Sequence, residues 1–127
     1  MPLGPLLAQA KIPLPDGGAD RDVRAIAYDS RKVKDGSLFV AIPGFHRDGT
    51  DFVADAVKNG AVAVVAERKV RTKAPLAVVP DVRAALADLA VAFFDHPTEK
   101  LKIVGVTGTD GKTTTVHLVS DVLEAAG

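Results

Sequence analysis

Short apolar runs separated by polar turns recur along this chain, and they predict strands that alternate with helices. The runs typical of strands lie at residues 23–28, 37–42, 61–66, 76–79 and 101–106. Each run is short and most are bounded by Gly, Pro or Asp, which favours strands over helices. Apolar positions at helical spacing predict helices at about residues 51–59, 81–96 and 112–126. This alternation indicates an α/β fold with a mixed or mostly parallel sheet and flanking helices.

The elements are distributed unevenly, which predicts a domain boundary. Residues 1–22 are rich in Pro and Gly and are expected to form a leader of short helix or coil. Residues 23–97 hold enough elements for one domain. Residues 98–127 hold only one predicted strand, a glycine-rich loop and one helix, which cannot build a core by themselves. We therefore expect the start of a truncated second domain there, and interpret the chain as a fragment of a longer protein.

Composition excludes several classes of protein. The 127 residues carry no formal net charge at pH 7 and include no cysteine. A neutral chain exerts no long-range attraction on nucleic acid or anionic membrane, and without cysteine there is no disulfide or thiolate metal site. No apolar run approaches the roughly 20 residues of a membrane span, and the N-terminus lacks the cationic start of a signal peptide. We expect a soluble, cytoplasmic, monomeric protein that binds neither nucleic acid nor membrane.

A glycine-rich segment between the last predicted strand and the last helix has the character of a phosphate-binding loop. It reads G-V-T-G-T-D-G-K-T-T from Gly105 to Thr114. Glycines let backbone amides converge on phosphate oxygens, Lys112 can reach the β- and γ-phosphates, and the Thr113 hydroxyl can ligate Mg²⁺. The strict pattern G-x-x-x-x-G-K-[ST] would place its first glycine at Val106, so this loop is a variant. The alternative, a glycine-rich turn with a solvated lysine, fits the strand–loop–helix context less well.

Two acidic residues bear on the metal chemistry of such a loop. Asp110 would repel phosphate unless it faced away or helped to hold the metal, and we expect it to face outward. Asp81 follows an apolar run and imitates the metal-binding acid of an ATPase strand. Because it precedes the phosphate loop in the chain, we interpret it as a helix N-cap.

The phosphate loop and several upstream segments together resemble the Mur ligase family of peptidoglycan synthesis. The family's loop is typically T-G-T-N-G-K-T, and residues 107–113 depart from it only at Asp110. The other similar segments are Asp29-Ser30-Arg31-Lys32-Val33, Gly36-Ser37-Leu38-Phe39-Val40-Ala41, Asp48-Gly49 before Asp51-Phe52-Val53, and Gly60-Ala61-Val62-Ala63-Val64-Val65. Phe94-Asp95-His96-Pro97 and residues 101–107 most resemble the MurE type. The resemblance covers residues 25–127.

The resemblance implies an ATP-dependent acid–amino-acid ligase with ATP and Mg²⁺ as cofactors. In such enzymes ATP phosphorylates the D-glutamate carboxylate of UDP-N-acetylmuramoyl-L-alanyl-D-glutamate. The amine of meso-diaminopimelate or L-lysine then attacks the acyl phosphate. Residues 23–97 would be the UDP-sugar-binding domain and residues 98–127 the start of the ATP-binding domain. We therefore expect this chain by itself to be inactive as a ligase.

The same resemblance implies roles for individual positions of this sequence. ATP would be bound by Gly108, Thr109, Asp110, Gly111, Lys112, Thr113 and Thr114, with Lys112 as the catalytic residue and Thr113 as the metal ligand. The UDP-sugar would be bound by Tyr28, Ser30, Phe45, His46 and Arg47.

Alternatives remain open from the residues alone. Spacing favours Ser30 as a turn-capping serine, with Asp29 and Arg31 as a surface ion pair, and only the resemblance reverses that interpretation. Arg47 is a better candidate for phosphate than His46, although a solvated basic loop is the more common use of such residues. For the whole chain, the alternatives are a dipeptide-adding Mur ligase, a stand-alone, non-catalytic nucleotide-binding module and, as a weaker third, a purely structural domain whose glycine loop binds nothing.

Overall fold

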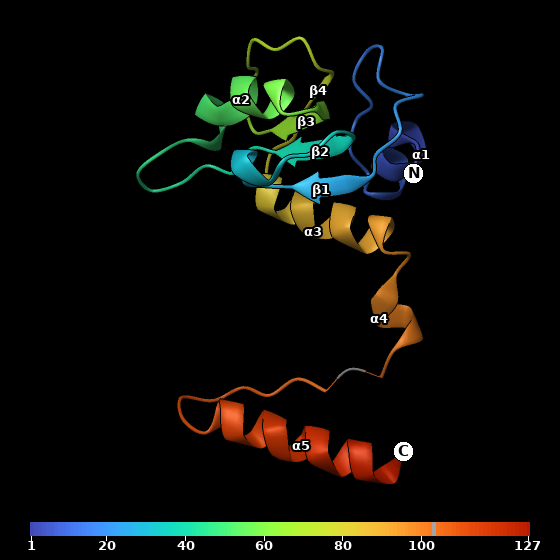
Figure 1. Ribbon diagram of the computed structural model, residues 1–127, viewed down its shortest axis with the longest axis vertical. Coiled ribbons are helices and arrows are strands. Elements are labelled where there is room, and N and C mark those ends of the chain that lie inside the picture. Colours follow the sequence, from blue (N-terminus) through green and yellow to red (C-terminus); the bar gives the residue numbers. More distant parts are fainter. Residues whose placement is uncertain (103) are drawn as a thin grey trace. The chain divides into compact units, whose positions relative to one another are not determined.

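The computed structural model describes residues 1–102 and 104–127, and the chain divides into two compact units (Figure 1). The first unit is Met1–Pro97 and the second is Thr98–Gly127. Among the described residues, no helix is both long enough and apolar enough to cross a membrane.

A four-stranded sheet forms the centre of the first unit. Its strands are β1 (Ala25–Ala27), β2 (Ser37–Val40), β3 (Ala61–Ala66) and β4 (Leu76–Val78). They lie side by side in chain order, and every neighbouring pair is parallel. The predicted α/β fold with a mostly parallel sheet is therefore confirmed.

Helices cover both faces of this sheet, so the unit has three layers (Figure 1). The helices α1 (Leu3–Gln9) and α3 (Val82–Phe93) share one core cluster with Leu38 and Val40 of β2. The helix α2 (Val53–Lys58) packs on the other face, against Phe39. All four residues of β2 are buried, as expected for a parallel strand that is covered on both sides.

The N-terminal residues, predicted to be a leader, contribute to the core of the first unit. Leu3, Leu6 and Leu7 of α1 are at most 1% exposed. The N-terminus is also joined to the residues just before β1, since the Val23 amide donates to the Met1 carbonyl at 2.8 Å. Pro5 in the first turn obscured the helical spacing of the leucines, although proline is tolerated there because first-turn amides lack intrahelical acceptors.

Some predicted elements have different bounds in the structure. β1 is shorter than the predicted 23–28. It begins later because the Val23 amide donates to the Met1 carbonyl and is not available to a neighbouring strand. The helix predicted at 51–59 begins as the 3-10 turn η2 (Gly49–Phe52) and continues as α2. The predicted N-cap is confirmed: the Asp81 carboxylate accepts from the amides of Arg83 and Ala84 at 2.9 and 3.0 Å.

The second unit contains the helix α5 (Lys112–Ala126), close to its predicted bounds. The prediction of a strand at residues 101–106 is wrong. Residues 101, 102 and 104–106 are not in a strand, and Ile103 lies outside the described residues. The short helix α4 (Pro97–Lys100) replaces the predicted polar link. A strand needs a hydrogen-bonded neighbour, and the described residues of this unit contain no other strand.

Candidate functional site

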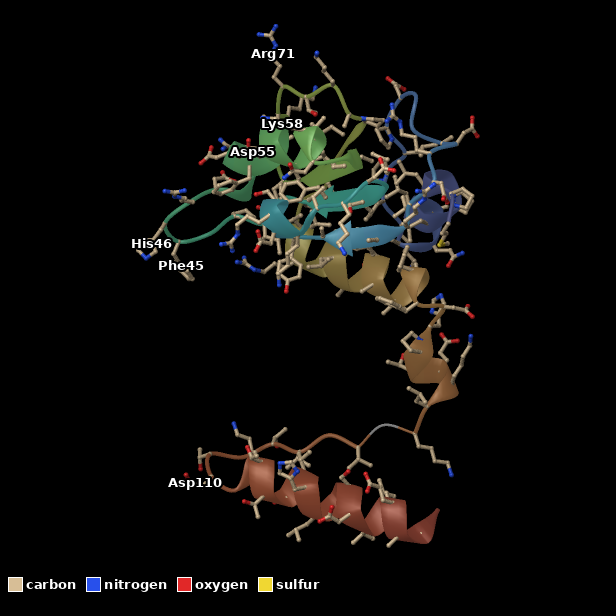
Figure 2. The ribbon with its side chains drawn as sticks, viewed as in Figure 1. Phe45, His46, Asp55, Lys58, Arg71 and Asp110 are labelled. Carbon is tan, nitrogen blue, oxygen red and sulfur yellow. The ribbon has the colours of Figure 1, made fainter. Side chains whose placement is uncertain are left out.

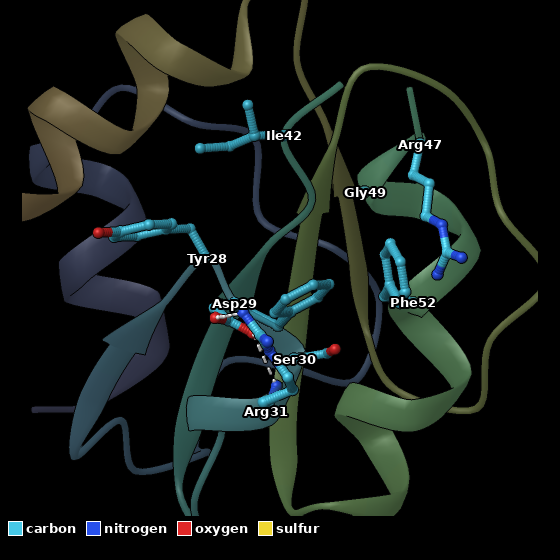
Figure 3. A pocket seen from close by; sticks show the side chains of 9 residues that line it. Tyr28, Asp29, Ser30, Arg31, Ile42, Arg47, Gly49 and Phe52 are labelled. Carbon is cyan, nitrogen blue, oxygen red and sulfur yellow. Dashed lines mark hydrogen bonds and ion pairs between the residues drawn. The ribbon is translucent and has the colours of Figure 1, made fainter. Parts of the chain in front are cut away.

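A pocket of about 440 Å³ opens where β1 and β2 end (Figure 3). It is lined by Tyr28, Asp29, Ser30, Arg31, Phe39, Ile42, Arg47, Gly49 and Phe52. The carboxyl ends of neighbouring parallel strands meet at one edge of a sheet, which is where open α/β folds bind their ligands. Three of the five predicted UDP-sugar residues, Tyr28, Ser30 and Arg47, are brought together here.

The Asp29-Ser30-Arg31 segment forms one wall of the pocket as the 3-10 turn η1 (Ser30–Lys32). Asp29 caps this turn by accepting from the Arg31 amide at 3.0 Å. Its carboxylate also accepts from Nε and Nη2 of Arg31, at 3.0 and 2.8 Å. The hydrogen bonds from Arg31 lower the pKa of Asp29 to about 2. The ion pair proposed from spacing is therefore present, but the cap is Asp29 rather than Ser30.

Ser30 is held through its backbone carbonyl, and within the part of the chain that the structure describes its hydroxyl has no hydrogen-bond partner. Asn59, just after α2, donates from Nδ2 to the Ser30 carbonyl oxygen at 3.0 Å. In Figure 3 the Ser30 hydroxyl points away from Tyr28, toward the side of the pocket where Phe52 lies. A hydroxyl can donate or accept, so this group is suited to a polar ligand atom.

The loop at residues 43–48 supplies the opposite wall. Its ends are joined by a bridge between Pro43 and Asp48, and Gly49 donates from its amide to the Ile42 carbonyl at 3.0 Å. A Cβ on Gly49 would lie 2.5 Å from that same carbonyl oxygen, so only glycine fits. Arg47 lies near Phe52, with its guanidinium carbon 6.0 Å from the ring centroid.

Phe45 and His46 do not line the pocket. They occupy the tip of the same loop, where Phe45 is fully exposed (Figure 2). The turn explains this separation, because the Gly44 amide donates to the Arg47 carbonyl at 3.0 Å and so directs the two intervening side chains outward. Their predicted contact with a sugar nucleotide remains a prediction.

The pocket combines aromatic and apolar side chains with two cations. Tyr28 and Phe52 offer faces for a planar ring, Phe39 is buried beneath the pocket, and Arg31 and Arg47 offer charge to an anionic group. Sequence reasoning did not assign Phe39 or Phe52 to the site, because apolar side chains at these positions indicate core packing. The rule that ligands bind at strand carboxyl ends indicates Phe39, which is one residue from the end of β2, but not Phe52, which lies in η2.

The predicted ATP loop lies in the second unit and leads into α5. Gly111 adopts a left-handed conformation, with φ of 73°, directly before the first helical residue. A side chain would strain that conformation, which explains glycine at this position. The amides of Lys112, Thr113 and Thr114 fall in the first turn of a 15-residue helix, where they have no intrahelical acceptor and can face an anion.

The polar side chains of this loop are accessible. Thr109, Lys112, Thr113 and Thr114 are exposed, as is Asp110 at the tip of the loop (Figure 2). Among the described residues, no group of three or more His, Asp or Glu side chains could hold a metal ion.

Residues 22–94 match the sequence profile of the Mur ligase family, catalytic domain. This span is more than half of the chain and includes every residue that lines the pocket. The chain belongs to the Mur ligase family. The match ends before residues 108–114, so it does not cover the predicted phosphate loop.

Relatives within this Mur ligase family carry more specific names. The chain is 49% identical over its whole length to the UDP-N-acetylmuramoyl-L-alanyl-D-glutamate--2,6-diaminopimelate ligase of Syntrophomonas wolfei, of which it covers 26%. The chain thus spans about a quarter of the length of the curated relatives that it matches.

Solved Mur ligase structures have the same fold. The UDP-N-acetylmuramoylalanyl-D-glutamyl-2,6-diaminopimelate--D-alanyl-D-alanyl ligase of Acinetobacter baumannii matches with a TM-score of 0.80 at 28% identity, over 98% of this chain and 28% of that one. The MurF ligase of Thermotoga maritima, solved with ADP, matches with a TM-score of 0.62 at 38% identity, over 73% of this chain and 21% of that one.

Proposed function

We propose that this chain is part of a MurE-type ligase, which adds meso-diaminopimelate or L-lysine to UDP-N-acetylmuramoyl-L-alanyl-D-glutamate in peptidoglycan synthesis. The observation that carries this proposal is the 49% identity, over the whole chain, to a ligase named for diaminopimelate addition. Identity to the dipeptide-adding ligase of Acinetobacter baumannii is 28% over 98% of this chain, and identity to the MurF ligase of Thermotoga maritima is 38% over 73% of it, so both are lower. The third-position reaction is therefore preferred to dipeptide addition.

The pocket at the ends of β1 and β2 is the proposed site for the UDP part of the substrate. A uracil ring would pack among the aromatic side chains, with the Ser30 hydroxyl on a polar atom of the nucleotide. Arg47 would bind the diphosphate, because a guanidinium offers paired donors to phosphate oxygens. Arg31 is less available for this task, since two of its nitrogens already donate to Asp29.

The loop before α5 is the proposed site for ATP and Mg²⁺. Backbone amides from Gly108 to Thr114 would surround the phosphates, and the N-terminus of α5 adds its partial positive charge. Lys112 would neutralise charge that develops on the transferred γ-phosphate, and Thr113 would provide an oxygen to Mg²⁺. ADP in the Thermotoga maritima relative supports a nucleotide in this family.

The chemistry proposed for the whole ligase has two balanced steps. A carboxylate oxygen of D-glutamate attacks the γ-phosphorus of ATP, which releases ADP and forms an acyl phosphate. The neutral amine of the incoming amino acid then attacks the acyl carbon, phosphate leaves, and the proton that the nitrogen loses as the amide forms is taken up by the phosphate. Lys112 acts in the first step by charge stabilisation rather than by proton transfer.

Calorimetric titration of the chain with UDP-N-acetylmuramoyl-L-alanyl-D-glutamate tests the proposed pocket. We expect binding that Ser30→Ala weakens, because the variant loses the hydroxyl offered to the nucleotide. Ser120→Ala is the matched control: it removes the same group from an exposed position of α5, in the second unit, and should leave the affinity unchanged. Binding of ATP without the sugar nucleotide would instead favour a stand-alone nucleotide-binding module.

A chimera tests whether the chain supports catalysis. Residues 1–127 would replace the matching quarter of the Syntrophomonas wolfei ligase, and amide formation with diaminopimelate would be measured. We expect activity that Lys112→Ala abolishes. A chimera that folds and binds both nucleotides but forms no amide would contradict the proposed function.

A further inference from the structure

Arg68, which follows β3, is bonded to the segment that ends the 43–48 loop. Its Nη2 donates to Asp48 Oδ2 at 2.7 Å and to Thr50 Oγ1 at 2.6 Å. Asp48 also accepts from the Thr50 amide at 2.9 Å, through its other carboxylate oxygen. Thr50 is only 8% exposed, so its hydroxyl has little access to water as an alternative partner. Three groups from two distant segments therefore form one network.

A second arginine holds the other end of the loop. Arg83, in the first turn of α3, donates from Nη2 to the Pro43 carbonyl at 3.1 Å. The two anchors are connected, because Glu67, the neighbour of Arg68, accepts from the Val82 amide at the start of α3. The loop is thus held where it leaves the sheet and where it returns.

Arg47 lies between these two anchors and is the cation that the loop contributes to the pocket. The turn around it is closed by the Gly44 amide, which donates to the Arg47 carbonyl at 3.0 Å. Phe45 and His46 at the tip are exposed and add no buried contact that would fix the loop. Apart from the approach of its guanidinium to the Phe52 ring, at 6.0 Å, the direction of Arg47 therefore depends on how firmly the ends of the loop are held.

We propose that Arg68 is a positioning residue, which holds the 43–48 loop so that Arg47 faces the diphosphate of a nucleotide in the pocket. This role rests on the proposed function of the pocket. A loop that already has its bound conformation loses less conformational entropy on binding. Without the anchor, only a fraction of molecules would present Arg47 correctly, and the apparent affinity falls by that fraction.

Titration with UDP measures the effect directly. Arg68→Ala is expected to weaken UDP binding roughly tenfold, corresponding to about one molecule in ten with the loop in place. Arg68→Lys keeps the charge and a single donor nitrogen, but not the planar guanidinium, and should recover part of the affinity. Arg71→Ala is the matched control: it removes the same charge from the same β3–β4 connection, and Figure 2 shows its side chain pointing away from Phe45 and His46.

A double-mutant cycle separates positioning from general destabilisation. If Arg68 acts through Arg47, Arg68→Ala should have little further effect on UDP affinity in an Arg47→Ala background. Equal weakening in both backgrounds would overturn the proposal, and so would equal weakening by Arg71→Ala. Unchanged UDP affinity in Arg68→Ala would overturn it as well.

Amide hydrogen exchange distinguishes this proposal from the function on which it rests. Exchange at Gly44 and Gly49 should quicken in Arg68→Ala, because their amides close the loop. A wild-type chain that binds no UDP would overturn the proposed function and this role with it. Normal UDP binding by the wild type, with unchanged loop exchange in Arg68→Ala, would overturn the positioning role alone.

Discussion

Replacing Leu6 of α1 by alanine tests whether the N-terminal segment is part of the core. Leu6 is 0% exposed and belongs to the cluster that α1 shares with α3 and the sheet. Truncating a fully buried leucine removes its transfer free energy and leaves a cavity, which together cost about 2–5 kcal/mol. Since domains of this size are stable by roughly 5–15 kcal/mol, the loss should be large but compatible with folding.

Urea denaturation followed by tyrosine fluorescence is a suitable assay. Tyr28 is the single tyrosine and there is no tryptophan, so the signal reports on the first unit. We expect Leu6→Ala to lower the free energy of unfolding with an unchanged m-value, which is the signature of a cavity in an intact fold. Leu14→Ala is the control, because Leu14 is 50% exposed and its loss should cost less than about 0.5 kcal/mol.

Two results would refute this reasoning. A loss below about 1 kcal/mol for Leu6→Ala would mean that α1 is not packed as the burial of Leu6 requires. A reduced m-value would mean that the variant exposes less surface on unfolding, because α1 is already detached in its native state.

Three further predictions concern the pocket and its supports. Gly49→Ala places a Cβ 2.5 Å from the Ile42 carbonyl oxygen, so it should lower the free energy of unfolding by about 1–3 kcal/mol and weaken UDP binding. A variant with the thermal stability and UDP affinity of the wild type would contradict this. Arg31 lowers the pKa of Asp29 to about 2, so the stability that this carboxylate contributes is complete above pH 3.8 and is lost as pH falls through 2. Carboxyl NMR titration should show this pKa rising in Arg31→Ala, and an unchanged pKa would contradict the ion pair between the two residues. Asp81→Ala should cost about 1 kcal/mol in urea denaturation, whereas Asp88→Ala, exposed later in α3, should cost less; equal losses would count against the cap.

Local features of the pocket could be predicted from the sequence, but the set of residues that line it could not. The Asp29–Arg31 pair lies within three residues, so spacing alone indicated it. Phe39 and Gly49 belong to segments that resemble the Mur ligase family, yet nothing local shows that they line a common cavity. The loop tip shows the same limit, since one turn directs Arg47 to the pocket and leaves Phe45 exposed.

The sequence by itself determined the features that depend on neighbours in the chain. These are the alternation of strands and helices, the Asp81 cap, and the pattern of glycines before α5 with Lys112 at its first position. Periodicity, capping and turn conformation act over a few residues, so composition and spacing predict them.

Only the tertiary structure decided the features that depend on distant partners. Leu6 is buried because α3 and the sheet cover it, and residues 101, 102 and 104–106 are not in a strand because the described part of their unit offers no neighbouring strand. Arg68 contacts Thr50 across 18 positions of sequence. Burial, sheet pairing and long-range hydrogen bonds are properties of the folded arrangement, and no local pattern encodes them.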